Sequence, residues 1–241
     1  MLPNHQALLR ETALSKLGIQ LSDIQIEQFS TYADLLIDWN EKVNLTSITD
    51  PQEIVIKHFL DSLTIGEFIQ GQGHRLADIG TGAGFPGVPL KILNPEIDLY
   101  LVDSLAKRLD FLKVVIGSLG LGGVTTVHSR AEDFGRDLQY RDRFDRVTSR
   151  AVARLPILLE YAIPLLKKGG LFLAAKGTLV DSEILESTKA LEILGAHVKD
   201  VARFNLGLEA EHRAIVVIEK ISQTPNAYPR KAGIPSKKPL I

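Results

Sequence analysis

The sequence contains no cysteine among its 241 residues. Without a thiol, the chain can form neither a disulfide nor a thiolate metal site. It also cannot attack a pyrimidine ring through a cysteine nucleophile, because that thiolate has to come from the protein. The six histidines show neither an HxxH nor an HExxH spacing, so we expect no bound metal.

Long apolar runs are also lacking. No run approaches the roughly 20 residues that cross a membrane, and the first residues do not join a basic region to an apolar core as a signal peptide does. We therefore expect a cytoplasmic protein without membrane contact. No apolar interface stands out in the sequence, so a monomer is the default expectation.

A strong net charge is missing as well. The value of −1 gives no global sign of nucleic-acid binding. The distribution is uneven, however, because residues 220–241 hold five basic residues and no acidic one. Such a segment is typical of a tail near a polyanion, and it is equally compatible with a solubilising tail.

The hydrophobic pattern changes near residue 70. Upstream, helical spacing predicts helices over 3–17, 22–43 and 50–69. Ser22 with Gln25 forms a capping-box pattern at the second helix, and Asp50 is the predicted N-cap of the third. Downstream, short apolar runs alternate with helical stretches such as 105–119, which predicts a mostly parallel sheet covered on both faces. The predicted strands lie at 75–79, 99–102, 124–128, 144–149, 171–175, 196–206 and 213–219.

These patterns predict an α/β fold in three parts. Residues 1–70 form a helical subdomain, residues 71–222 carry the sheet, and residues 223–241 form an extended, basic, proline-rich tail. The last two strands follow each other without a helix between them. We therefore expect an antiparallel hairpin that closes the sheet.

The central chemical signal is a glycine-rich turn after the first strand, at Gly80, Gly82 and Gly84. In open α/β sheets, such a turn lies at the carboxyl end of the strand, where ligands bind. Glycine lets the backbone approach a ligand closely. Gly82, Gly84 and Gly87 also satisfy the GxGxxG pattern of dinucleotide enzymes, so the glycines alone leave the cofactor undecided.

Two carboxylates bear on that choice. Asp78 lies two residues before Gly80, where it suits a cationic ligand such as the methionine amine and disfavours a phosphate. Asp103 ends the next strand and suits the ribose hydroxyls of either cofactor, or it caps the helix at 105–119. The terminal hairpin and the lack of a second substrate domain favour an S-adenosylmethionine-dependent methyltransferase over an NAD-dependent dehydrogenase.

Further motifs, in order along the chain, carry a resemblance to a known family. They are Trp39–Thr46, Lys57–Ser62, Asp78–Gly87, Val102–Ser104 with Lys107 and Arg108, Arg130–Glu132, Ser149–Ala151, Lys176 with Gly177, and Tyr228–Lys231. With these motifs the sequence closely resembles the bacterial 16S ribosomal RNA guanine-N7 methyltransferases, also called the glucose-inhibited division protein B family. The resemblance implies a Rossmann-like class I S-adenosylmethionine-dependent methyltransferase with a mostly parallel seven-stranded sheet, an antiparallel C-terminal hairpin and an N-terminal helical appendage.

The resemblance also implies an activity and a cofactor site. The activity is methyl transfer from S-adenosylmethionine to N7 of guanine 527 in 16S ribosomal RNA, with this RNA or the small-subunit particle as partner. Phe85 would line the methionine end of the cofactor, and Asp103 would hold its ribose. The implied cofactor site comprises Asp78, Gly80, Gly82, Gly84, Phe85, Asp103, Ser104, Ala131, Glu132 and Arg150.

Arg150, after the fourth strand, is expected to face the methyl-transfer cleft. Enzymes that methylate exocyclic amines resemble one another in an Asn/Asp-Pro-Pro-aromatic motif at this place, and 148–152 does not contain it. Guanine N7 carries an in-plane lone pair, so its methylation needs alignment and no proton removal. Arg150 suits guanine O6 or a phosphate, because donation to N7 would block the reacting lone pair.

Arg130 and Arg150 are the predicted catalytic residues, with ion-paired surface arginines as the alternative interpretation. His58, Asp61 and Ser62 look like triad ingredients, but they are compressed on one helix, so we interpret them as packing or capping residues. The predicted RNA contacts, mainly to backbone phosphates, are Arg130, Lys176, Arg230 and Lys231.

Three alternatives stay open from the residues alone. An NAD-binding oxidoreductase would bind a dinucleotide, and a small-molecule methyltransferase would keep the chemistry with another substrate. A non-catalytic RNA-binding or cell-division regulator would leave its RNA unchanged. Titration with both cofactors and mass mapping of ribosomal RNA separate these alternatives.

Overall fold

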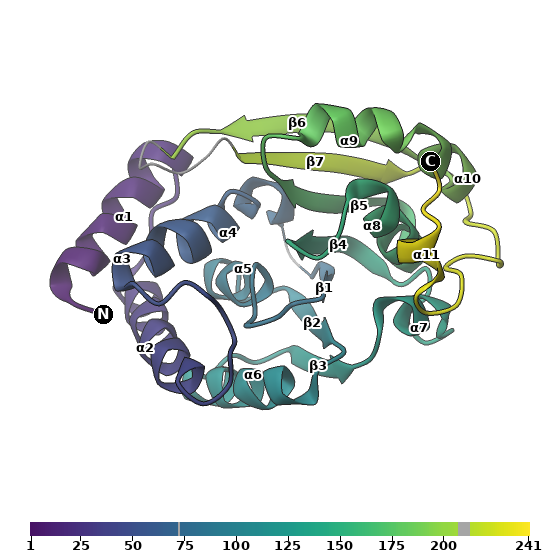
Figure 1. Cartoon of the computed structure of the whole chain (residues 1–241). Coiled ribbons are helices and arrows are strands. Elements are labelled where there is room, and N and C mark those ends of the chain that lie inside the picture. Colours follow the sequence, from purple (N-terminus) through teal and green to yellow (C-terminus); the bar gives the residue numbers. More distant parts are fainter. Residues whose placement is uncertain (72, 207–212) are drawn as a thin grey trace.

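A seven-stranded sheet forms the centre of the molecule in the computed structural model, with the strand order β3-β2-β1-β4-β5-β7-β6 (Figure 1). The structure describes residues 1–71, 73–206 and 213–241. The strands are β1 (Arg75–Ile79), β2 (Asp98–Asp103), β3 (Val124–His128), β4 (Phe144–Arg150), β5 (Leu166–Lys176), β6 (Ala196–Phe204) and β7 (Arg213–Lys220).

The first five strands are parallel, and β7 pairs antiparallel with both β5 and β6. The chain builds outward from β1 to β3 and then returns to β4 on the other side of β1. The carboxyl ends of β1 and β4 therefore flank the point where the strand order reverses. Ligands of open α/β sheets bind at such a point.

Helices cover both faces of this sheet (Figure 1). One layer contains α1 (Pro3–Leu17), α2 (Asp23–Asn40), α3 (Pro51–Glu53), η1 (Ile54–Leu60), α4 (Asp61–Leu63), η2 (Gly66–Ile69), α5 (Gly87–Leu93) and α6 (Ala106–Ser118). The remaining helices are α7 (Ala131–Arg136), α8 (Leu155–Ala162), η3 (Ile163–Leu165), α9 (Val180–Glu186), α10 (Thr188–Leu194) and α11 (Ile234–Lys237). Within the described ranges, no helix is long and apolar enough to span a membrane.

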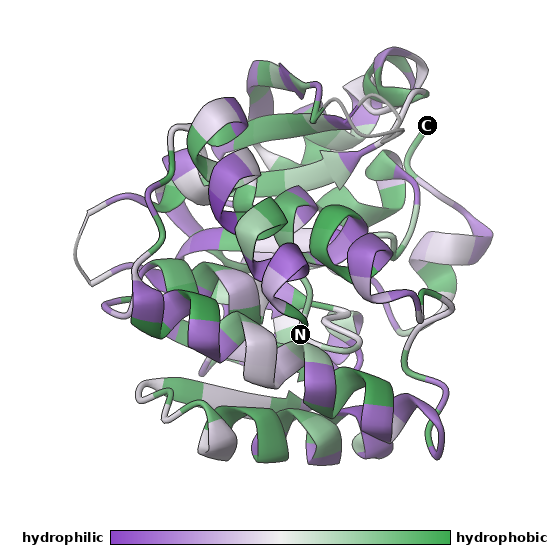
Figure 2. Cartoon of the chain, turned by 90° about the vertical axis from the view of Figure 1, so that its left-hand side faces the viewer, coloured by the Kyte–Doolittle hydropathy of each residue, from purple (hydrophilic) through white to green (hydrophobic). Residues whose placement is uncertain are grey.

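The helices of residues 1–69 share one hydrophobic cluster with the sheet. Phe29 of α2 and Phe59 of η1 lie in the same buried cluster as Leu76 of β1 and Leu101 of β2. Figure 2 shows that these helices carry both hydrophobic and hydrophilic residues. Because an amphipathic helix stabilises itself by burying its apolar face, this layer depends on the sheet for its packing.

Helix α2 begins where the sequence predicts and ends slightly earlier. Ser22 and Gln25 form the expected reciprocal capping box. The predicted end at residue 43 is wrong by three residues, because the side chain of Asn40 accepts hydrogen bonds from the backbone of Leu45 and Thr46. This side chain turns the chain away from the helix.

The third predicted helix is irregular. Asp50 caps it as expected, since its carboxylate accepts from Glu53 N at 2.9 Å. The expected single α-helix to residue 69 is wrong, because η1 is a π-helix and η2 is a 3₁₀-helix. A π-helix adds a residue to each turn and frequently marks a functional site.

The C-terminal segment is folded onto the body, so the expectation of an extended tail is corrected. Arg230 forms an ion pair with Glu160 of α8, whose side chain is fully buried. Leu240 is 9% exposed and joins the cluster between the sheet and α8. A buried carboxylate that needs a cation explains why this segment docks.

Candidate active site

The glycine-rich turn follows β1 at the carboxyl edge of the sheet. Gly80, Gly82 and Gly84 have φ angles of 68°, 61° and 99°, which residues with a Cβ atom rarely adopt. A Cβ atom on Gly84 would lie 2.6 Å from Tyr32 Oη, so the turn packs tightly on α2. A Cβ atom on Gly82 would meet nothing closer than 4.0 Å. The backbone at Gly82 therefore borders open space that a ligand can fill.

Asp78 lies in β1 beneath this turn and is fully buried. Its Oδ2 accepts hydrogen bonds from Thr81 Oγ1 at 2.7 Å and Gly87 N at 2.9 Å. Its buried Oδ1 has no partner among the residues that the structure describes. Burial raises the pKa of Asp78 to about 6, because the charged form is poorly solvated. A buried acceptor without a donor fits the ammonium group of the predicted cofactor.

Asp103 ends β2 and fastens the turn from the other side. Its Oδ2 accepts from Gly82 N and its Oδ1 from Leu105 N, both at 2.9 Å. Arg108 lies 3.3 Å from Oδ2. Each carboxylate oxygen offers a further lone pair, so these contacts leave acceptor capacity for ribose hydroxyls. That ribose contact stays a prediction.

A pocket of about 370 Å³ opens beside Asp103. It brings together predicted residues from the ends of β1, β2 and β3. Of the predicted cofactor residues, Asp78, Gly82, Gly84, Phe85 and Arg150 do not line it. Its wall includes Gly80, Asp103, Ser104, Arg130, Ala131, Glu132, Val152, Tyr161 and Gly233.

Glu132 joins this pocket to the C-terminal segment. Its Oε1 accepts from Gly233 N at 2.8 Å, and Gly233 itself lines the pocket. Burial, together with the Glu132 carboxylate, raises the pKa of Tyr161 to about 12. Arg130 is exposed at the mouth, where no described residue bonds to its guanidinium. The C-terminal segment thus forms a wall that the sequence did not predict.

Arg150 ends β4 and points toward the N-terminal helices. Its Nη1 donates to Lys57 O at 2.9 Å and to Asp61 Oδ2 at 2.8 Å. Its Nη2 donates to His58 Nδ1 at 3.1 Å. The guanidinium carbon lies 5.1 Å from the centre of the Phe85 ring, which adds a cation–π contact. The π-helix therefore holds a cation over the glycine-rich turn.

His58 completes this arrangement. Its ring stacks on Phe85 with 4.4 Å between the ring centres. Burial, with Arg150 nearby, lowers the pKa of His58 to about 3, so the ring is neutral at pH 7. Its Nδ1 accepts from Arg150, and its Nε2 donates to Thr46 Oγ1 at 3.0 Å. Both ring nitrogens of His58 are therefore used, and the ring bridges Arg150 and Thr46.

The sequence pattern favoured packing or capping roles for His58 and Asp61 and did not reveal their contacts with Arg150. These contacts span 92 and 89 residues along the chain. One signal was available, because Asp61 is a lone acid in the run Phe59-Leu60-Asp61-Ser62-Leu63. A carboxylate that is buried in this way requires a cationic partner.

Two predicted RNA contacts are occupied by protein groups. Lys176 donates to Ala153 O at 2.8 Å and pairs with Glu183 at 2.7 Å, and its side chain is 8% exposed. Arg230 binds both carboxylate oxygens of Glu160. Lys176 and Arg230 therefore have partners within the protein, and their phosphate contacts stay predictions. Lys231, the remaining prediction, is exposed.

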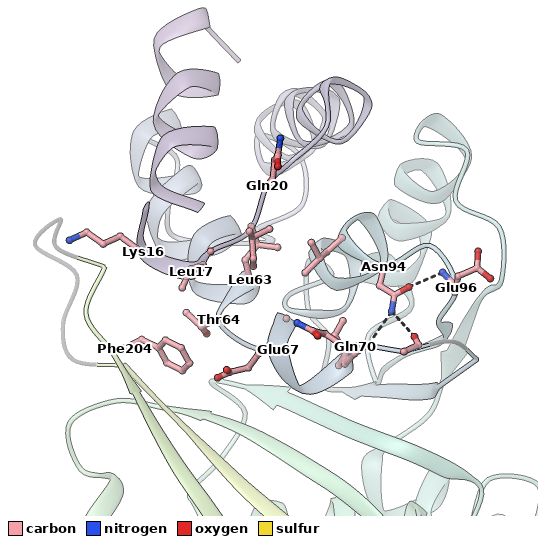
Figure 3. A pocket seen from close by; sticks show the side chains of 16 residues that line it. Lys16, Leu17, Gln20, Leu63, Thr64, Glu67, Gln70, Asn94, Glu96 and Phe204 are labelled. Carbon is pink, nitrogen blue, oxygen red and sulfur yellow. Dashed lines mark hydrogen bonds between the residues drawn. The ribbon is translucent and has the colours of Figure 1, made fainter. Parts of the chain in front are cut away.

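A larger pocket, of about 690 Å³, lies between the end of α1, η2, the loop after α5 and Phe204 at the end of β6 (Figure 3). The Asn94 side chain donates to Ile69 O and Gly71 O, so it ties two loops together. None of the predicted site residues lines this pocket. Size alone therefore does not identify the active site.

A family model described as GidB, rRNA small subunit methyltransferase G, matches residues 25–215. The chain belongs to this family. It is 67% identical over 241 residues to a protein named ribosomal RNA small subunit methyltransferase G from Desulfitobacterium hafniense (strain Y51), with 100% of both chains covered. A protein of the same name from Acetivibrio thermocellus is 50% identical over 226 residues, which covers 94% of this chain and 93% of that protein.

Solved structures resemble the fold at low sequence identity. An S-adenosylmethionine-dependent methyltransferase from Aquifex aeolicus superposes with a TM-score of 0.54 and 18% identity, covering 71% of this chain and 94% of that chain. NSun6 from Pyrococcus horikoshii with SFG gives a TM-score of 0.56 at 16% identity, covering 69% and 53%.

Family and fold together confirm the principal predictions. The seven-stranded class I methyltransferase fold is confirmed, as is membership of the rRNA methyltransferase family. The roles of individual site residues stay predictions. In the part of the chain that the structure describes, no cluster of three or more potential metal ligands occurs.

Proposed function

We propose that this chain transfers the methyl group of S-adenosylmethionine to N7 of a guanine in small-subunit ribosomal RNA. The observation that carries the proposal is the carboxyl end of β4. There Arg150 lies over Phe85 of the glycine-rich turn. The sequence has no cysteine, and residues 148–152 lack the motif of exocyclic-amine methyltransferases. Membership of an rRNA methyltransferase family supports the same substrate class.

The chemistry of this cleft suits a nucleophile that needs no deprotonation. S-adenosylmethionine, when bound, supplies an electrophilic methyl group on a sulfonium. A general base would need a free acceptor near the reacting atom, and of the acceptors that surround Arg150 neither His58 nor Asp61 is free. His58 instead accepts from Arg150, and Asp61 is paired with Arg150 and Arg213. The remaining work of the protein is to align the reacting atoms and to exclude water. This is sufficient for guanine N7, whereas an exocyclic amine also has to lose a proton.

The finer assignments belong to the same proposal. The target is guanine 527, as the family resemblance implies, and the enzyme acts as a monomer in the cytoplasm. Arg130 and Lys231, which are exposed, contact RNA phosphates. Arg150 faces the base.

Methyl transfer from labelled S-adenosylmethionine tests the proposal. Purified enzyme is incubated with 16S ribosomal RNA and, in parallel, with small-subunit particles from a strain that lacks the gene. Methylated RNA is then treated with borohydride and aniline, which cleave the chain at N7-methylguanine. We expect label and a single cleavage site at guanine 527 with at least one of the two substrates.

The alternatives give different results. Label without cleavage would place the methyl group on another atom, and no label in either RNA would contradict the substrate. Calorimetric titration separates the cofactors, since we expect S-adenosylmethionine to bind and NAD not to bind. Binding of NAD alone would favour the oxidoreductase.

A further inference from the structure

A second pocket, of about 420 Å³, lies next to the pocket of about 370 Å³ that we assign to the cofactor and call the cofactor pocket. Ala151, which follows β4, lines both pockets. Its φ angle is 55°, a left-handed conformation that costs free energy for a residue with a Cβ atom. Strained residues of this kind cluster at active sites. The second pocket therefore begins where the cofactor pocket ends.

The lining of this pocket combines both signs of charge with apolar side chains. Arg150 and Lys176 face it together with the carboxylates Asp61 and Glu183. The apolar part of the lining includes Ile48, Ala153, Ala175 and Ile215. A ligand that fits needs an apolar ring face and an edge with both acceptors and donors. Guanine has O6 and N7 as acceptors, and its N1–H and N2 amino groups are donors.

Unused hydrogen-bonding groups remain on both sides of the pocket. An arginine has five N–H donors, and the contacts of Arg150 to Lys57, His58 and Asp61 use three. Glu183 accepts from Leu155 N and pairs with Lys176 through Oε2, and no described residue bonds to its Oε1. Two donors and one carboxylate oxygen are therefore available to a ligand.

The order of these groups along the sheet matches the order of atoms around guanine. The strands run β1, β4, β5, so the glycine-rich turn comes first, Arg150 second, and Glu183 of α9, after β5, third. Around the base, N7 is followed by O6 and then by N1 with N2. A base with N7 toward the cofactor consequently places O6 at Arg150 and its N1–N2 edge at Glu183.

We propose that this pocket receives the target guanine, turned out of its stack, with Arg150 donating to O6 and Glu183 accepting from the N1–N2 edge. The inference rests on the proposed function and adds the subsite that selects the base. Enzymes that act on a base inside folded nucleic acid commonly extrude it into such a pocket. Adenine is rejected because its N1 would present a lone pair to the Glu183 carboxylate.

The test replaces the target guanosine in the RNA by inosine, which keeps O6, N1–H and N7 but lacks the N2 amino group. Single-turnover methyl transfer is measured for both RNAs with the unmodified enzyme and with Glu183→Gln. Loss of one charge-assisted hydrogen bond should slow the unmodified enzyme about tenfold on inosine. With Glu183→Gln we expect guanosine to react about tenfold slower and the preference over inosine to fall to about twofold.

Controls distinguish an effect on base selection from a loss of folding and from a failure of the proposed function. Glu186→Gln, on the same helix and paired with Arg154, should keep the tenfold preference. S-adenosylmethionine affinity reports folding, and Glu183→Asp, which retracts the carboxylate, serves if Glu183→Gln does not fold. An unchanged preference in both Glu183 variants would overturn the subsite while leaving the proposed function standing. No methyl transfer to guanosine by the unmodified enzyme would overturn both.

Discussion

Arg150 owes its position to three groups of the irregular helical segment η1–α4, and Asp61 supplies the only charge among them. Asp61→Asn keeps the shape of the side chain and removes that charge. Because a small displacement of a positioned group costs rate more than binding, we expect kcat on RNA to fall about tenfold. Affinity for S-adenosylmethionine, measured by calorimetry, should stay within about twofold.

A double-mutant cycle shows whether Asp61 acts through Arg150. Arg150→Ala should lower kcat about a hundredfold, as loss of a donor in the reacting cleft typically does. Adding Asp61→Asn to Arg150→Ala should then have no further effect. Glu53→Gln serves as the matched control, since Glu53 at the end of α3 pairs with Lys57 of η1 and both side chains are partly exposed. Additive losses would show that Asp61 has only a structural role.

Asp78 should make cofactor binding depend on pH. Burial raises the pKa of its carboxyl group to about 6, while Arg150 lowers it and Asp103 raises it. Below this pH the protonated form accumulates and no longer attracts a cationic ammonium group. We expect the affinity for S-adenosylmethionine, measured by calorimetry, to fall about tenfold between pH 7 and pH 5.

Asp78→Asn isolates this effect from other titrating groups. The amide keeps the size of the side chain and cannot ionise, so its binding should be weaker at pH 7 and nearly constant from pH 7 to pH 5. A variant that retains the full pH dependence would assign the effect to another group.

At the scale of elements, the C-terminal segment changes from a predicted RNA tail to a part of the fold. Substitutions of the adjacent residues Arg230 and Lys231 distinguish a role in stability from a role in RNA binding. Arg230→Ala leaves Glu160 buried without its cation, which should lower the free energy of unfolding by about 3 kcal/mol. Lys231→Ala should leave stability unchanged and reduce the salt dependence of RNA binding by about one counterion. Urea unfolding and RNA titration at several salt concentrations provide the two measurements.

The opposite pattern would restore the original interpretation. If Arg230→Ala weakened RNA binding without destabilising the protein, Arg230 would contact phosphate and its pairing with Glu160 would be dispensable.

Elements that depend on local pattern were predictable from the sequence. The strands followed from short apolar runs, α2 from its capping box, and the glycine-rich turn from its spacing. Contacts between distant segments were not predictable, because a periodic pattern shows which face is buried and not what lies against it. Asp61 and Glu160 illustrate this limit, since each is an isolated acid in an apolar run whose arginine partner lies elsewhere in the sequence. The π-helix was equally hidden, because seven residues are too few for its wider turn to show in the apolar spacing.

At the scale of the molecule, the helical layer and the sheet meet at the cofactor turn. Tyr32 of α2 donates to Ala83 O, and Phe85 stacks on both Tyr32 and His58. The turn is thus held by α2 and η1 as well as by β1 and β2. Residues 1–70 act in this arrangement as one wall of the active site, although the sequence suggested a separate subdomain.

This shared packing predicts one cooperative unfolding transition. Trp39, the only tryptophan in the sequence, lies in α2 and packs on Phe111 of α6, with 5.7 Å between the ring centres. Its fluorescence therefore reports the N-terminal layer, whereas circular dichroism reports all helices and strands. Since α2, η1, β1 and β2 bury residues in one cluster, we expect both signals to give the same urea midpoint. A fluorescence midpoint clearly below that of circular dichroism would show that residues 1–70 unfold alone, and the helical layer would then be an independent subdomain.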